Sequence, residues 1–141
     1  MFYKVNRFDL KGKVQLATQE KYYLVDIGLL NILMGKDRIS NRGHILENIV
    51  YLELLRRGNK IWTGTDRTSE VDFVCRTPLG DINYIQVAWL LSDEKTMERE
   101  FSALEKIKDN YPKLLLTTDS YTQNRSGIKM LNVFQWLLDL D

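Results

Sequence analysis

Three oxygen-bearing side chains follow one another in an order that could hold a divalent cation. Glu47 lies in a helical segment rich in apolar residues, Asp72 in an alternating strand segment, and Gln86 fourteen residues later in a second β-rich segment. Carboxylate and amide oxygens suit Mg²⁺ and Mn²⁺, and such a cation could activate water for attack on a phosphodiester. Each residue also has a structural interpretation: a helix glutamate paired with an arginine, a solvent-facing strand aspartate, and a hydrogen-bonded core amide.

The segment Ser69–Trp89 predicts the β-hairpin around which the other elements are organised. Its first half alternates between apolar and other residues, and its second half is rich in β-branched and aromatic residues. Residues 77–81 (T-P-L-G-D) supply turn chemistry between the two halves. Pairing residues at equal distances from this turn places Asp72 opposite or diagonal to Ile85 and Gln86.

The remaining elements are predicted from hydrophobic periodicity and from capping residues. Asp26 is expected to cap a short helix that stops at Gly35, Ser92 is expected to cap a later helix, and Gly58 should end the helix that carries Glu47. A helix, three strands, a helix and a strand thus follow an N-terminal hairpin, which predicts an α/β domain with a mixed central sheet flanked by helices. The expected strands are Phe2–Asp9, Lys21–Val25, Lys60–Thr65, Leu114–Thr118 and Ile128–Val133, and the expected helices are Gly28–Leu33, Ser40–Gly58, Ser92–Asn110 and Phe134–Leu140.

Composition limits the classes of function. The 141 residues suffice for one domain, and 44% hydrophobic with 28% charged residues is typical of a globular protein outside the membrane. A net charge of +1 is low for a dedicated nucleic-acid binder, so such binding would need a local basic edge. A single cysteine and the lack of an apolar targeting segment predict a cytoplasmic location. Candidates for the basic edge are Arg42, His44, Lys60 and Arg67, with Arg56 and Arg57 nearby.

Four sequence motifs, in order from Lys21 to Ala88, carry a family resemblance. K-Y-Y-L-V-D-I-G-L-L, R-G-H-I-L-E-N-I-V-Y-L-E-L, E-V-D-F-V and Y-I-Q-V-A resemble a C-terminal domain of unknown function that follows a AAA-type P-loop ATPase in many bacterial and archaeal proteins. The resemblance implies a restriction-endonuclease-like αβββαβ core of the PD-(D/E)xK type in residues 21–141. It also implies that residues 1–20 connect this domain to an ATPase portion. The chain has no G-x-x-x-x-G-K-[ST] motif, so we expect no ATP binding by the chain itself.

The resemblance assigns Glu47, Asp72 and Gln86 to metal-ligand positions and Ala88 to the position of the catalytic lysine. Gln86 replaces a carboxylate and Ala88 replaces an amine. Lys95 could replace the lost amine.

Either Glu98 or Glu100 could supply the lost carboxylate. We therefore expect a catalytically degenerate module that needs no cofactor and binds DNA, RNA or a protein partner of an ATPase system, and that has no membrane association. One alternative is an active endonuclease with a rearranged Mg²⁺ or Mn²⁺ site. The other is a structural or oligomerisation domain without a ligand.

Overall fold

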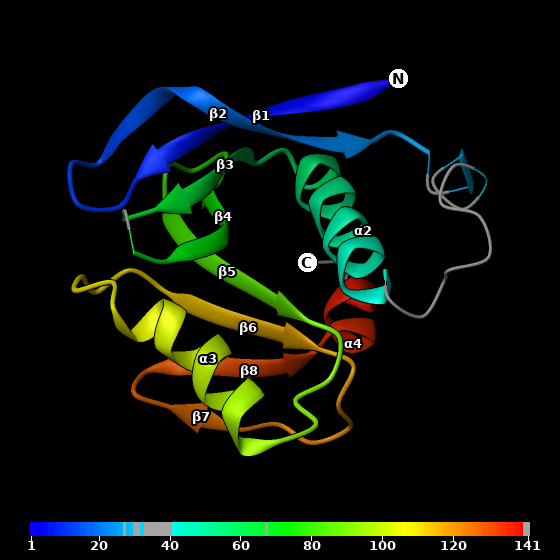
Figure 1. Cartoon of the computed structure of the whole chain (residues 1–141), viewed down its shortest axis with the longest axis vertical. Coiled ribbons are helices and arrows are strands. Elements are labelled where there is room, and N and C mark those ends of the chain that lie inside the picture. The colour runs from blue at the N-terminus through cyan, green and yellow to red at the C-terminus, as the bar shows by residue number, and fades with distance from the viewer. Residues whose placement is uncertain (27, 30–31, 33–40, 67, 140–141) are drawn as a thin grey trace.

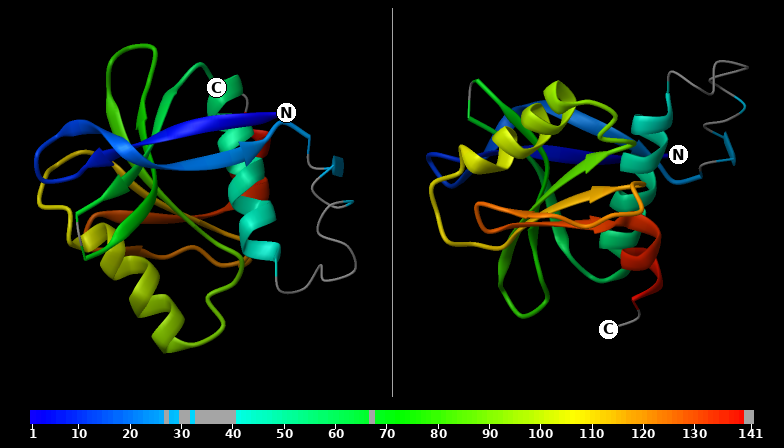
Figure 2. Two further views of the ribbon diagram at one scale, coloured as in Figure 1. Left: turned by 45° about the horizontal axis from the view of Figure 1, so that its top comes forward. Right: turned by 90° about the horizontal axis from the view of Figure 1, so that it is seen from below.

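Eight strands form a single mixed sheet in the order β2-β1-β3-β4-β5-β6-β8-β7 (Figure 1). The computed structural model describes residues 1–26, 28–29, 32, 41–66 and 68–139. Helix α3 packs on one face of the sheet, and α2 and α4 pack on the other (Figure 2). The strands are β1 (Phe2–Asp9), β2 (Val14–Leu24), β3 (Lys60–Thr65), β4 (Glu70–Arg76), β5 (Ile82–Ala88), β6 (Lys113–Thr117), β7 (Asn124–Arg125) and β8 (Ile128–Asn132), and the helices are α2 (Arg42–Arg56), α3 (Glu94–Glu105) and α4 (Val133–Leu138).

The N-terminal hairpin is longer than the sequence predicts. Strand β1 has the expected bounds, but β2 begins at Val14 and not at Lys21. Residues 14–20 are mostly polar or exposed and show no apolar alternation, so their pairing with β1 has no signal in the hydrophobic pattern. Strand β1 then runs parallel to β3, which joins the hairpin to the rest of the sheet.

Helix α2 lies within the predicted segment Ser40–Gly58. Gly58 follows the helix with a φ of +79°, a conformation that glycine adopts without strain. The predicted cap at Asp26 is present, because its carboxylate accepts hydrogen bonds from the backbone N–H groups of Gly28 and Leu29. Much of the short helix predicted after Asp26, including Gly35, lies outside the described residues.

The central hairpin forms as predicted and contains an irregularity at its functional end. Between two regular β3–β4 pairs, Thr63 alone stands opposite both Asp72 and Phe73. This β-bulge re-aims the side chains of β4, a common feature beside active sites. The β4–β5 pairing also stops at Phe73 and Ile85, one residue before Asp72 and Gln86 would face each other.

Two helix boundaries differ from the predictions. Helix α3 is capped by Asp93, whose side chain accepts from the Thr96 N–H, so the predicted cap at Ser92 is wrong by one residue. The helix also ends at Glu105 and not at Asn110. In the segment that follows, the Asp109 carboxylate accepts a hydrogen bond from the Tyr111 N–H and forms a local turn that competes with helix.

The C-terminal elements agree closely with the prediction, except for one strand. Strands β6 and β8 and helix α4 fall within one residue of the predicted starts. Strand β7 has only two residues and was not predicted, since so short a strand carries no period. From α2 to β6 the elements follow the predicted order, so the mixed α/β architecture is confirmed. No helix in the described ranges combines the length and apolarity required to cross a membrane.

Candidate functional site

Glu47 is a buried carboxylate that meets an ammonium from the N-terminal hairpin. It projects from α2 and is only 7% exposed. The Tyr23 hydroxyl donates to Glu47 Oε1 over 2.5 Å, and the Lys21 ammonium donates to the same oxygen. The Tyr23 ring is fixed in turn by stacking on Tyr51, with ring centroids 4.3 Å apart. Burial of Glu47 is thus compensated by an internal cation and a hydroxyl donor.

Asp72 lies on the other side of the Lys21 ammonium. Its Oδ1 is 3.9 Å from Lys21 Nζ, while its Oδ2 accepts a 2.9 Å hydrogen bond from the Val87 N–H. Burial, followed by the negative charge of Glu47, raises the pKa of Asp72 to about 7, against the opposing effects of Lys21 and the Val87 N–H. The Asp72 carboxyl therefore exchanges its proton near neutral pH.

Gln86 joins the two strands where their backbone pairing ends. Its amide oxygen accepts from the Asp72 N–H over 3.1 Å, and its amide nitrogen donates to Glu100 Oε2 over 2.9 Å. The Asp72 carboxylate in turn accepts from the N–H of Val87. Side-chain groups therefore take the place of backbone partners where the β4–β5 pairing ends. Through its two amide hydrogen bonds, Gln86 links Asp72 to Glu100 of α3.

Glu47, Asp72 and Gln86 are linked by a series of contacts that includes Lys21. The contacts run from Glu47 through Lys21 to Asp72, and then through Gln86 to Glu100. Within the described ranges, no three or more His, Cys, Asp or Glu side chains form a group that could hold a metal ion. As arranged here, the cluster does not fit the divalent-metal site that the sequence suggested.

The residues that were expected to replace the missing amine and carboxylate lie in different places. Ala88 is buried at the end of β5 and adds no polar group. Lys95 is exposed in the first turn of α3, and no hydrogen bond or ion pair joins its side chain to the cluster. Glu98 pairs with Arg125 at 2.7 Å, so Glu100 is the acid that reaches the cluster.

The predicted basic residues do not share one edge. Arg42 and His44 are exposed in the first turn of α2, and the Arg42 guanidinium lies 5.4 Å from the centre of the Trp89 ring. Lys60 begins β3 at the end of the sheet away from Asp72, and Arg67 lies outside the described residues. Among the candidates that the structure describes, Arg42 and His44 therefore lie at the end of α2 nearer the cluster.

The two arginines at the end of α2 are engaged by a neighbouring acid. Glu53 accepts hydrogen bonds from both Arg56 and Arg57. These contacts, with that from Arg56 the largest, lower the pKa of Glu53 to about 2, so the group stays ionised at any ordinary pH. Arg56 and Arg57 therefore serve local structure.

A hollow of about 420 Å³ adjoins the cluster at the end of β5. Ala88 and Trp89 line it from the strand, Gly43 from α2, and Arg99 and Glu100 from α3. Arg99 is exposed and donates to Glu100 Oε1 over 2.6 Å. The hollow thus offers the Trp89 ring and the Arg99 guanidinium beside Ala88.

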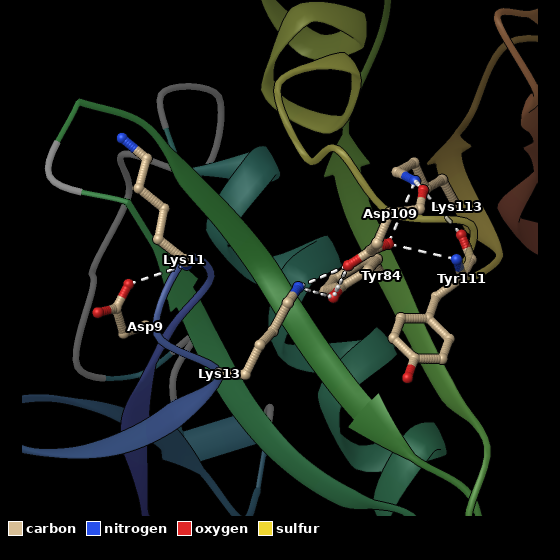
Figure 3. Close-up of polar contacts among 7 residues, drawn as sticks. All are labelled: Asp9, Lys11, Lys13, Tyr84, Asp109, Tyr111 and Lys113. Atoms are coloured by element: carbon tan, nitrogen blue, oxygen red, sulfur yellow. Dashed lines mark hydrogen bonds and ion pairs between the residues drawn. The ribbon is translucent and has the colours of Figure 1, made fainter.

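Sequence reasoning missed a second polar cluster on the α3 face (Figure 3). Lys13 donates to Asp109 Oδ2 over 2.5 Å and to the Tyr84 hydroxyl over 2.7 Å, and that hydroxyl also donates to Asp109. Lys113 donates to the Asp109 carbonyl over 2.6 Å. Because Lys13 belongs to the β1–β2 turn, this cluster ties the hairpin to the loop after α3.

Comparison with known proteins finds similarity to longer chains. No family model matches, and no solved structure matches. An uncharacterized protein of Haemophilus influenzae is 40% identical over 139 residues, which cover 98% of this chain and 34% of that relative. The uncharacterized protein MJ1544 of Methanocaldococcus jannaschii is 35% identical over 114 residues, which cover 77% of this chain and 24% of that relative. The chain thus spans about a third or less of either relative.

Proposed function

We propose that this chain is a restriction-endonuclease-like module of the PD-(D/E)xK type that binds nucleic acid without cutting it, as the C-terminal part of an ATPase system. The observation that carries the proposal is the contact of the Lys21 ammonium with both Glu47 and Asp72. The single positive charge of Lys21 then offsets part of the negative charge that would otherwise attract a metal ion. Gln86 and Ala88 supply neither the third charge nor the amine that hydrolysis would need.

The binding face that we propose surrounds the hollow at the end of β5. The Arg42 guanidinium and the exposed Arg99 supply phosphate contacts, and the partly exposed Trp89 ring supplies a surface for a base. This face uses few cations, in keeping with the net charge of +1, so we expect weak binding with a shallow dependence on salt, because the slope scales with the number of phosphates neutralised. The ATPase assignment rests on the sequence resemblance, and the partial coverage of two longer relatives is compatible with it.

An active nuclease with a rearranged site is the second candidate. The observation in its favour is that Glu100 reaches Gln86, which brings a third carboxylate toward the cluster, while Lys21 supplies an amine. In that case the catalytic amine would come from the N-terminal hairpin, and not from Lys95. Metal binding would require Lys21 to leave the two carboxylates.

Two assays separate these functions. The first is nicking of supercoiled plasmid in Mg²⁺ or Mn²⁺ by the parent and by Asp72→Ala. The second is fluorescence anisotropy of labelled single- and double-stranded DNA and RNA at rising salt. For the second assay, Arg42→Gln is compared with Arg56→Gln, which removes the same charge from an exposed position at the other end of α2.

We expect no cleavage above background and salt-dependent binding that Arg42→Gln weakens and Arg56→Gln leaves unchanged. Cleavage that disappears in Asp72→Ala would replace our proposal with the rearranged nuclease. An absence of binding to every nucleic acid at low salt would instead favour a structural or protein-binding domain.

A further inference from the structure

A cavity of about 650 Å³ opens far from the acidic cluster, near the beginning of the strand that carries Gln86. Asn83 and Ile85 of β5 line it, whereas Gln86 and Ala88 lie toward the other end of the same strand. The cavity lies on the face that α2 and α4 cover. Its volume is within the range of pockets that hold small organic molecules.

The cavity combines apolar walls with a cationic rim. Leu54, Ile85, Leu114 and Trp136 contribute apolar surface. Cationic side chains reach the rim from the end of α2 and from β8, and no aspartate or glutamate is among the lining residues. In a protein with nearly equal numbers of acidic and basic residues, this one-sided charge favours an anion.

One of these cations is held in place by the protein. Arg57 donates to Glu53 and to the Trp136 carbonyl, and its guanidinium lies 4.4 Å from the centre of the Trp136 ring. Lys113 also lines the cavity, but its ammonium contacts Asp109 in the polar cluster on the α3 face, as Figure 3 shows. Positions fixed before binding reduce the entropy that a ligand must overcome.

Two further polar groups at the cavity are available to a ligand. Lys129 is exposed on β8, and neither its ammonium nor the Asn83 amide has a hydrogen bond or ion pair with the residues the structure describes. We propose that this cavity binds a small organic anion with a planar apolar body, the body resting on Ile85 and Leu114 and the anionic group meeting Lys129. Both nucleotides and aromatic carboxylates have this chemistry.

The test uses two dyes that share an apolar body. 1-Anilinonaphthalene-8-sulfonate carries a sulfonate, and N-phenyl-1-naphthylamine is its uncharged counterpart. Their affinities are measured by fluorescence with the parent, with Lys129→Glu and with Lys11→Glu. Lys11 is an exposed lysine outside the cavity, so Lys11→Glu controls for the change in net charge.

We expect the parent to bind the sulfonate dye more tightly than the neutral dye, and Lys129→Glu to reduce this preference about tenfold, since it reverses one charge beside the bound anion. The preference should survive in Lys11→Glu. Equal binding of the two dyes by the parent, or equal effects of the two variants, would overturn the proposal.

Displacement of the sulfonate dye then identifies the source of the anion. Displacement by AMP but not by adenosine would assign nucleotides, and displacement by indole-3-acetate but not by AMP would assign aromatic carboxylates. Displacement by neither anion would overturn the proposal. None of these measurements depends on nucleic-acid binding at the end of β5, so the two proposals can fail separately.

Discussion

Replacing Lys21 with methionine tests the acidic cluster most directly, because it removes the ammonium and keeps an unbranched side chain. An ammonium 3.9 Å from Asp72 Oδ1 contributes about 4 kcal/mol at an effective dielectric constant of about 20. Because the Lys21 side chain is 33% exposed, we halve this to about 2 kcal/mol, equivalent to about 1.5 units in the pKa of Asp72. The contact with Glu47 is lost as well.

Lys21→Met should therefore destabilise the fold in a pH-dependent way. Breaking a buried ion pair costs about 3 kcal/mol when the remaining charge stays buried, and we expect a loss of that size at pH 8. The pKa of Asp72, already raised to about 7 in the parent, should rise further in the variant. At pH 5 Asp72 is protonated in both proteins, so the loss of unfolding free energy in urea should be about 1 kcal/mol smaller there than at pH 8.

Manganese provides the second readout. With the ammonium gone, Mn²⁺ should enter between the carboxylates of Lys21→Met. At a concentration ten times its dissociation constant, Mn²⁺ would restore about 1.4 kcal/mol of unfolding free energy. Lys4→Met, on the same hairpin but paired at the exposed surface with Glu20, should show neither effect. If Lys21→Met is equally destabilising at pH 5 and pH 8 and gains nothing from Mn²⁺, Lys21 does not stand in for a metal cation.

Three further substitutions test neighbouring contacts. The raised pKa of Asp72 means that this residue contributes less stability as pH rises from about 4 to about 7. Asp72→Asn should therefore flatten the pH dependence of the unfolding free energy and match or slightly exceed parent stability at pH 7. A loss above about 2 kcal/mol in urea unfolding would make Asp72 a structural hydrogen-bond partner. Gln86→Glu should tighten Mn²⁺ binding, measured by calorimetry, from an affinity that is at most millimolar in the parent. Adding Ala88→Lys to this variant should give weak nicking of plasmid. An unchanged Mn²⁺ affinity would place Gln86 outside any metal site. Lys13→Gln should cost about 1 kcal/mol in thermal unfolding, and no loss would mean that its contact with Asp109 adds nothing.

Periodicity and turn residues predicted most of the fold. The central hairpin, the helix carrying Glu47 and the closing glycine at Gly58 were predicted from local signals, and the structure contains all three. The early end of α3 was not predictable from the helical stripe, since Asp109 is engaged by Lys13 of a distant turn. The bulge at Asp72 likewise depends on pairing with β3, which no local pattern encodes.

The sequence placed Asp72 and Gln86 near each other on neighbouring strands, but the role of Lys21 beside Glu47 and Asp72 was not predictable. Lys21 is one of 20 basic residues, and nothing local to its strand distinguishes it. Its inward direction follows from its place beside Tyr23 two residues on, because alternate strand residues share a face. That face was assignable only once β2 had been placed over α2, which is a tertiary contact.

Gln86 suits the metal-free arrangement better than a carboxylate would. Its amide nitrogen donates to Glu100 over 2.9 Å while its oxygen accepts from the Asp72 N–H. A glutamate at this position would place two acceptor-only groups against each other, and it would need a shared proton or a bound cation to remain there. With the amide at position 86 and the Lys21 ammonium between Glu47 and Asp72, the network has the donors it needs from its own side chains. The Gln86 amide and the Lys21 ammonium therefore act together, since both supply donors to neighbouring carboxylates.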